Sequence, residues 1–525
     1  MKDPVDVHKV FAEYFKGCEA LAYALSSRLA EGNICIDIKD YASNTELSAE
    51  NPFFSNRDGF LKQTEEGYYV THTTDGSVLK PIVIMNGNAY LQRYFKYETE
   101  IIKNIRRLGD KFHIVTGGPG SGKTYSVAKR LNDLFRQNPN LKAALAAPTG
   151  KAAFRMYESI KNYALKPENH INENIKPLLK GLKAETIHRL LGYRPDSVFF
   201  KYDEKNRLPY DVVIIDECSM VDGALMSKLL SAIGDNTILY LIGDRDQLAS
   251  VEAGSVFGDL CRAAGSDLLK GRVEIISGSR RFKQDEGIWR ISQKIIKAEP
   301  FSDIDFKADE QVSIDYYYSD ELFLENALIY AEYISEENIG TALKKLNRVR
   351  FLCVTKENDR SVAEYNKKIR NALRNNTEGF NPKSEGFYHN QPIMITKNDY
   401  KLNLFNGDIG IIREKEVNGR NVFMAFFEAP DNQIREIQAG YLNHWKEVFA
   451  MTIHKSQGSE FDNVVVVLPE KQGKKLLTRE LLYTGVTRAT GKVLIQSNQE
   501  IISECIGKGV IRASGLESRI IENKN

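Results

Sequence analysis

The stretch FHIVTGGPGSGKTYSVAKRL, residues 112–131, passes from β-forming residues through a loop with four glycines into a helical pattern. Glycine lets a backbone curve tightly and approach a ligand closely. The beginning of a helix offers free N–H groups and the positive end of its dipole to an anion. A buried strand, such a loop and a helix together favour an α/β fold that is built around a phosphate site.

Residues 117–124, GGPGSGKT, fit the pattern G-x-x-x-x-G-K-[ST]. In this pattern Lys123 is expected to reach the β- and γ-phosphates of ATP, and the hydroxyl of Thr124 to bind Mg²⁺. We expect the nucleotide to be bound by Gly117, Gly118, Pro119, Gly120, Ser121, Gly122, Lys123, Thr124 and Tyr125.

Further apolar runs of strand length follow this loop, and helix-compatible stretches separate them. One series lies at residues 142–150, 210–220 and 237–244, and a second at residues 349–355, 448–458, 463–469 and 492–497. Nearly continuous apolar strands that alternate with helices are typical of a parallel sheet covered on both faces. The sequence therefore predicts two α/β units, each with a parallel sheet.

Other regions have a different pattern. The length of 525 residues predicts about three to four domains. Residues 1–84 show helical spacing and no catalytic constellation, which predicts a small helical module. Residues 392–449 form short alternating strands with a hairpin signal at Asn418 and Gly419, which predicts an inserted β module. We assign residues 85–300 to the first unit, 301–391 to a linker and the start of the second, and 450–525 to its remainder.

The run DVVIIDECSM, residues 211–220, ends an apolar strand with two carboxylates. Asp216 is expected to hold Mg²⁺, and Glu217 to take a proton from the attacking water. By itself an acidic pair is more often a solvated surface feature. The buried strand before it, in a chain that also has a phosphate loop, favours the catalytic role.

Three further positions invite a role in phosphate chemistry. Gln247 follows another apolar strand and could sense the γ-phosphate or position water, but it could equally be a turn residue. An arginine of GSRRF (Arg280 or Arg281) and Arg488 of YTGVTRAT could neutralise charge in the transition state. A surface ion pair is the commoner role of an isolated arginine, so composition alone does not identify them.

The order of the motifs adds a separate argument. The segments GGPGSGKT, APTGKAA, TIHRLLG, DECSM, GDRDQL, SRRF, MTIHKSQGSEF and LYTGVTRA follow one another like motifs I, Ia, Ib, II, III, IV, V and VI of superfamily 1 helicases. From about residue 90 onward the chain resembles this superfamily, and LFNGDIG, TIHKSQGSEFD and TRELLYTGVTRA are similar to the RecD family in particular. The resemblance implies two RecA-like P-loop NTPase domains, a small helical N-terminal domain and an SH3-like β insertion in the second RecA-like domain.

The resemblance also implies roles for single residues. The family's ATPase positions are matched by Lys123, Thr124, Asp216, Glu217 and Gln247. Arg488 matches the motif VI arginine that faces the γ-phosphate. Motif IV in the family tends to be Ser-Tyr-Arg-Phe, so Arg281 aligns as the arginine finger, although Arg280 stands beside it. Gln92 resembles the glutamine upstream of motif I that recognises adenine.

The motifs APTGKAA, TIHRLLG and MTIHKSQGSEF combine small, hydroxyl and basic residues that suit contact with a sugar-phosphate chain. Hydroxyls bond phosphates without reading the base sequence, and histidine can also stack on a base. A structural histidine is the alternative for His188 and His454, and their motif context favours DNA. The expected DNA contacts are Pro148, Thr149, Lys151, Thr186, His188, Thr452, His454, Lys455 and Ser456.

The composition narrows the classes of protein to which the chain could belong. Lys and Arg number 72 and Asp and Glu 70, a balance that neither supports nor excludes nucleic-acid binding. The six cysteines form no CxxC pair, which favours reduced thiols over a disulfide or zinc framework. The sequence shows no signal peptide and no apolar run of about 20 residues, so we expect a cytoplasmic protein that does not contact a membrane.

The resemblance implies an ATP-dependent 5′–3′ translocase and helicase on single-stranded DNA that acts at duplex DNA ends in double-strand break repair and recombination. It implies a heterotrimer with RecB-like and RecC-like subunits, docked through the N-terminal module, in which nuclease activity belongs to the complex. Two alternatives stay open: a free-standing helicase of the longer RecD-like or Dda type, and a nucleotide-gated binding protein without unwinding activity. Glu217, the candidate arginines and the DNA-type motifs argue against the second.

Overall fold

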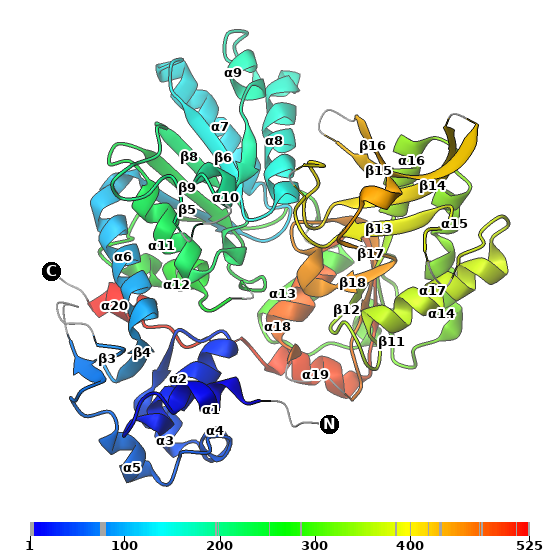
Figure 1. Ribbon diagram of the computed structural model, residues 1–525. Helices are drawn as coiled ribbons and strands as arrows, with labels where there is room; N and C mark the ends of the chain where they lie inside the picture. The colour runs from blue at the N-terminus through cyan, green and yellow to red at the C-terminus, as the bar shows by residue number, and fades with distance from the viewer. Residues whose placement is uncertain are drawn as a thin grey trace.

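The computed structural model describes residues 5–522 except 74–79, 195, 196, 198, 251, 284, 285, 384, 385, 400, 418, 430–432, 472, 474, 475 and 511. Within these residues the strands form four sheets (Figure 1). Two of the sheets are parallel throughout and carry the residues of the expected helicase motifs. The predicted α/β fold with two parallel sheets is confirmed.

The first parallel sheet has the order β10-β5-β9-β8-β6-β7. Its strands are β5 (Phe112–Gly117), β6 (Ala143–Ala147), β7 (Ala184–Thr186), β8 (Val212–Ile215), β9 (Ile238–Gly243) and β10 (Val273–Ile276). Its helices are α6 (Gln92–Leu108), α7 (Lys123–Gln137), α8 (Gly150–Leu165), α9 (Lys176–Lys180), α10 (Ile187–Leu190), α11 (Gly223–Ala232) and α12 (Val256–Arg262). Successive residues of one strand face opposite layers: Ile114 packs with α6 and α11, and Val115 with α7 and α8.

The second parallel sheet has the order β11-β20-β19-β12-β18. Its strands are β11 (Val312–Asp315), β12 (Val349–Cys353), β18 (Ala450–Thr452), β19 (Phe461–Val467) and β20 (Ala489–Gln496). One face is covered by α13 (Gly287–Ile296), α18 (Arg479–Val486) and α19 (Gln499–Gly507). The other face is covered by α14 (Asp320–Leu328), α15 (Ala331–Ile334), α16 (Ile339–Leu346) and α17 (Val362–Asn376).

An antiparallel sheet is inserted between β12 and β18 and has the order β16-β15-β14-β13-β17. Its strands are β13 (Gln391–Ile395), β14 (Ile409–Val417), β15 (Arg420–Glu428), β16 (Ile434–Gln438) and β17 (Trp445–Glu447). Val417 pairs with Arg420, and Gly419 between them has a φ of +75°, as a two-residue hairpin turn requires. Asn418, the other half of the hairpin signal, lies outside the described residues.

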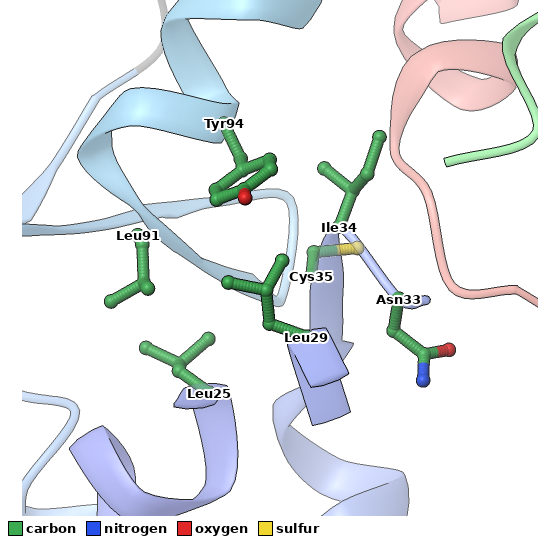
Figure 2. Close-up of a pocket in the computed structure, with 7 residues that line it drawn as sticks. All are labelled: Leu25, Leu29, Asn33, Ile34, Cys35, Leu91 and Tyr94. Atoms are coloured by element: carbon green, nitrogen blue, oxygen red, sulfur yellow. The ribbon is translucent and has the colours of Figure 1, made fainter. Parts of the chain in front are cut away.

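The N-terminal region combines the expected helices with a mixed sheet of order β1-β4-β3-β2. Its helices are α1 (Val7–Ala12), α2 (Glu19–Ala30), α3 (Ile38–Ser43), α4 (Thr45–Ala49) and α5 (Arg57–Lys62), and its strands are β1 (Cys35–Asp37), β2 (Val70–His72), β3 (Ile82–Met85) and β4 (Asn88–Leu91). Gly17, with a φ of +85°, lies between α1 and α2, so the expected helical stretch is broken in two. Figure 2 shows how side chains of α2, β1 and the beginning of α6 face one another, which joins this region to the first unit.

Two helices lie in a different unit from the one that the expected boundaries gave them. The apolar face of α13, which a division at residue 300 places in the first unit, is part of the second core. The last helix, α20 (Leu516–Glu522), packs with α6 and α12 of the first unit, although residues 450–525 were expected in the second. The sequence pattern of a short amphipathic helix shows its apolar face and leaves the choice of sheet open.

A buried ion pair fastens α20 to the first unit. Glu98 of α6 is fully buried, and its carboxylate accepts hydrogen bonds from Arg519, Ser514 and the N–H of Gly515. Removing one partner of a buried pair leaves a charge without compensation, which costs about 3 kcal/mol or more.

Arg519→Met is therefore expected to lower the free energy of opening of α6, measured by amide hydrogen exchange, by about 3 kcal/mol. Lys103→Met is the matched control, because Lys103 pairs with Glu100 on an exposed face of the same helix and should cost less than about 1 kcal/mol. Equal losses in the two variants would show that the buried pair does not hold α20.

Among the described residues, the helices include none that is long and apolar enough to cross a membrane.

Candidate nucleotide and nucleic-acid site

The phosphate loop connects β5 to α7 at the carboxyl edge of the first sheet. Gly120 and Gly122 have φ values of +70° and +91°, which only glycine adopts without strain. The ammonium group of Lys123 donates hydrogen bonds to the carbonyl oxygens of Gly117 and Gly118, at 2.6 and 2.9 Å. The lysine therefore lies folded against the loop that was expected to hold phosphate.

Residues 279–281 lie over this loop. The N–H of Arg280 donates to the carbonyl of Gly120 at 2.7 Å, and a Cβ on Gly120 would lie 2.5 Å from that of Arg281. The structure separates the two arginines that the sequence left open. The guanidinium carbon of Arg280 lies 4.3 Å from the ring centroid of Tyr125, whereas Arg281 forms an ion pair with Glu460.

The two carboxylates follow β8 beside the loop. Burial, and then the neighbouring Glu217, raise the pKa of Asp216 to about 7, and a hydrogen bond with the Thr124 hydroxyl opposes that rise. A hydroxyl and a carboxylate side by side are the oxygen ligands that Mg²⁺ prefers, so these two residues fit that ion. Glu217 has a φ of +53°, and its N–H donates to an oxygen of Asp216 at 2.8 Å. A non-glycine residue in this region stores strain, which is common at functional sites.

Asp244, which directly follows β9, accepts the main hydrogen bonds of motif III. Its buried carboxylate accepts hydrogen bonds from the Gln247 amide at 3.1 Å and from the hydroxyl of Tyr483, on α18 of the second unit, at 3.0 Å. The same hydroxyl would lie 3.1 Å from a Cβ on Gly118. Motif III therefore connects the phosphate loop to the second unit. Asp244 and Tyr483 were not among the expected site residues, although both stand inside the quoted motifs.

Arginines from both units converge on Glu460, which lies in motif V between η8 (Ile453–Ser456) and β19. Arg281 donates a hydrogen bond to the Glu460 carboxylate, and a nitrogen of Arg155 on α8 lies 3.9 Å from it. Burial raises the pKa of Glu460, but the guanidinium groups of Arg281, Arg155 and Arg488 hold it below its usual value. Sequence reasoning missed Arg155 and Glu460, because no motif pattern states which charges face each other.

Arg488 is almost fully buried just after α18. Its guanidinium donates to the carbonyl oxygens of Thr484 at 3.1 Å and Ser459 at 3.3 Å. These two backbone contacts fix the direction of the side chain.

Three threonines occupy equivalent places in motifs Ia, Ib and V. Thr149 lies two residues after β6, and Thr186 and Thr452 are the last residues of β7 and β18. Each hydroxyl accepts a hydrogen bond from the N–H three residues later, at 3.2, 3.3 and 3.3 Å. The motifs thus present helix beginnings capped by threonine at the edges of both sheets.

The other expected DNA residues differ in access. His188 is exposed, and its ring contacts those of Tyr193 and Phe200 edge-on. Pro148, Lys151, His454 and Lys455 are partly exposed. Ser456 is fully buried and its hydroxyl donates to the carbonyl of Ile453 at 2.7 Å, so the structure gives it no access to a strand. A seryl hydroxyl that bonds its own helical turn cannot be distinguished in the sequence from one that faces a ligand.

A loop of the inserted sheet, residues 404–408, lies between motifs Ia, Ib and V. Phe405 would lie 3.2 Å from a Cβ on Gly150, and the guanidinium carbon of Arg189 is 5.7 Å from its ring centroid. The amide oxygen of Asn406 accepts a hydrogen bond from the Lys455 ammonium group at 2.7 Å. This loop, which carries the first five residues of LFNGDIG, therefore brings the insertion to the residues expected to contact DNA.

Gln92 is the first residue of α6, and its N–H donates to the carbonyl of Pro81 at 2.8 Å. Among the described residues, no hydrogen bond joins the side chain of Gln92 to the phosphate loop.

Two family models match the chain. Residues 99–253 match the AAA domain, and residues 447–495 match the UvrD-like helicase C-terminal domain. The first match spans the phosphate loop and motif III, and the second spans motifs V and VI. The expected P-loop nucleotide-binding unit is thereby confirmed.

Similar proteins cover from about three quarters to nearly all of the chain. The RecBCD enzyme subunit RecD of Mycolicibacterium smegmatis is 32% identical over 99% of this chain and 97% of its own length. RecBCD enzyme subunit RecD of Haemophilus influenzae is 32% identical over 83% of this chain and 75% of its own length. The ATP-dependent RecD2 DNA helicase of Deinococcus radiodurans is 29% identical over 73% of this chain, but over only 46% of its own length.

Among solved structures, the Pif1 helicase from Bacteroides in complex with ADP-AlF3 and single-stranded DNA is 17% identical, with a TM-score of 0.40 over 76% of this chain and 92% of that chain.

Proposed function

This chain belongs to the RecD family of superfamily 1 helicases, and from that premise we propose that it is an ATP-dependent DNA translocase and helicase that moves 5′ to 3′ on single-stranded DNA. The observation that carries the proposal is the meeting of both units over the phosphate loop. Tyr483, Arg488 and Glu460 come from the second unit, and Lys123, Asp216 and Asp244 from the first. Hydrolysis then depends on closure of the two units, which is how ATP can drive motion.

In the proposed mechanism each residue of the nucleotide site has one task. Lys123 leaves the loop carbonyls to bind the β- and γ-phosphates, and Glu217 accepts a proton from the attacking water. Thr124 and Asp216 would hold Mg²⁺, which neutralises phosphate charge when bound. Gln247 orients the water, and Arg281 and Arg488 stabilise charge on the γ-phosphate in the transition state.

We assign the finger role to Arg281, since Arg280 packs over Tyr125. The loop glycines, with Pro119, Ser121 and Tyr125, are proposed to enclose the phosphates. Gln92 is proposed as the adenine contact on the family resemblance alone.

The proposed strand groove runs along the helix beginnings of motifs Ia, Ib and V. Pro148, Thr149 and Lys151 would contact the strand from the first unit, with Thr186 and His188 beside them. Thr452, His454 and Lys455 would contact it from the second. Hydroxyl, imidazole and ammonium groups bind phosphate and sugar without selecting bases, and a translocase needs contacts of that kind.

We further propose that the chain works with RecB-like and RecC-like subunits at duplex DNA ends, in cytoplasmic double-strand break repair and recombination. Exposed apolar residues of the N-terminal region support docking there; they are Val5, Val7, Val10, Tyr14 and Tyr68. The alternative of a free-standing helicase is less well supported, because the chain matches under half of the RecD2 helicase and nearly all of a RecD subunit. We propose that residues 1–84, 85–300, 301–391, 392–449 and 450–525 serve as functional regions, with α13 and α20 assigned as described above.

Direction on DNA is tested with duplexes that carry one single-stranded tail. With ATP and Mg²⁺ the chain, alone or with its two partner subunits, is expected to unwind a duplex with a 5′ tail in a reaction that requires Lys123. The chain alone is expected to leave a duplex with a 3′ tail intact. RecB-like subunits could contribute unwinding of their own, so the complex is also assembled with the Lys123→Gln chain. Unwinding from the 3′ tail that requires Lys123 would contradict the proposed polarity.

A further inference from the structure

The Glu460 carboxylate pairs with Arg281, the arginine that the proposed mechanism requires at the γ-phosphate. This carboxylate accepts a hydrogen bond from Arg281, the proposed finger, while the other terminal nitrogen of that arginine, Nη1, is buried and lacks a hydrogen-bond partner among the described residues. A carboxylate repels a γ-phosphate and competes with it for the same guanidinium group. As long as this ion pair persists, Arg281 is not free to act on ATP.

Arg155 offers Glu460 a second partner. Its guanidinium lies 3.9 Å from the Glu460 carboxylate, outside hydrogen-bond distance, whereas Arg281 is within it. Arg155 is one helical turn after Lys151 on α8, so both side chains lie on the same side of that helix. A small movement of α8 would exchange the two partners of Glu460.

Both sides of this contact belong to segments that are proposed to hold DNA. Helix α8 begins at the Thr149 cap of motif Ia. Glu460 follows, in motif V, the turn that begins at the Thr452 cap and contains Lys455. A strand bound between these caps therefore contacts the same two backbone segments that carry Arg155 and Glu460.

We propose that Glu460 and Arg155 are positioning residues through which single-stranded DNA switches on ATP hydrolysis. With the groove empty, Glu460 holds Arg281 away from the γ-phosphate. With a strand bound, α8 and the motif V segment approach each other. Glu460 then pairs with Arg155 in place of Arg281, and Arg281 is free to bind the γ-phosphate. This inference rests on the proposed function and adds to it the residues that couple the two sites.

The test measures kcat and KM for ATP with and without oligo-dT in two variants of opposite expected effect. Glu460→Gln keeps the shape and removes the charge, so the DNA-free kcat should rise about 5- to 10-fold, within the range of coupling between sites. Arg155→Gln leaves Glu460 on Arg281, so kcat with oligo-dT should fall toward the DNA-free value of the same variant. Arg155→Lys should restore part of the stimulation.

The double variant Arg155→Gln/Glu460→Gln distinguishes the exchange of Glu460 between Arg281 and Arg155 from general damage to the active site. It should behave like Glu460→Gln alone, because Arg155 acts only through the glutamate, and two independent lesions would instead add. Asp462→Asn is the matched control, since this exposed carboxylate of the same segment pairs with Arg348 and not with Arg155 or Arg281.

The inference is overturned if the wild type is stimulated by oligo-dT while Glu460→Gln hydrolyses ATP without DNA no faster than the wild type. It is also overturned if the double variant is additive. A wild type that oligo-dT stimulates neither alone nor with both partner subunits present would overturn the proposed function, and this inference with it.

Discussion

Arg488→Ala is expected to lower kcat for ATP hydrolysis by about 10³-fold or more, within the range that arginine fingers contribute to phosphoryl transfer. Arg488 is almost fully buried and fixed by the carbonyls of Thr484 and Ser459, so its charge reaches the phosphates only when the second unit closes on the first. The measurement is the steady-state rate with saturating oligo-dT and ATP. Binding of a fluorescent ATP analogue should change much less than the rate, because the effect belongs to the transition state.

Loss of a buried arginine could also loosen the second unit, and two further variants control for this. Arg488→Lys keeps a positive charge but not the two-nitrogen geometry, and it should remain far below the wild type. Arg420→Ala removes an exposed arginine of β15 and should be neutral. A loss of less than tenfold in a folded Arg488→Ala protein would contradict the role assigned to Arg488.

Glu217→Gln is expected to lower kcat by about 10²- to 10⁴-fold, because glutamine cannot accept the proton of the attacking water. Binding of ATP should persist, since Lys123 and the phosphate loop are untouched. Chase experiments should show that the variant holds ATP and single-stranded DNA together without turning over.

The strained backbone at Glu217, with its φ of +53°, makes an isosteric change preferable to alanine. Glu204→Gln, at an exposed position of the same unit, is the matched control. A Glu217→Gln enzyme with more than a tenth of the wild-type kcat would show that another group accepts the proton.

Much of the fold could be predicted because it follows from local patterns. The apolar run in β8 is buried on both faces, and such runs are typical of a parallel sheet that is covered on both sides. The hairpin between β14 and β15 follows from a turn in which Gly419 has a positive φ. The order of the helicase motifs adds what local patterns lack, and similarity to RecD subunits over nearly the whole chain confirms the family.

What could not be predicted depends on contacts between residues far apart in the sequence. The helix α20 carries an apolar face that fits either unit, and the buried pair between Glu98 and Arg519 places it on the first. The charge of Glu460 is plain in the sequence, but its position among three arginines requires both units to be folded and in contact. The buried hydroxyl of Ser456 is a further example, because its partner is the backbone of its own turn.

The central claim is that ATP hydrolysis by this chain is coupled to single-stranded DNA, and the most direct test is the ATPase rate with and without oligo-dT, beside Lys123→Gln. The account predicts strong stimulation by DNA in the wild type and a background rate in the variant under both conditions, since Lys123 is required at the phosphates. The assay is repeated with RecB-like and RecC-like subunits that carry no ATPase activity of their own. Rapid hydrolysis that is indifferent to DNA, or none with DNA and both partners present, would contradict it.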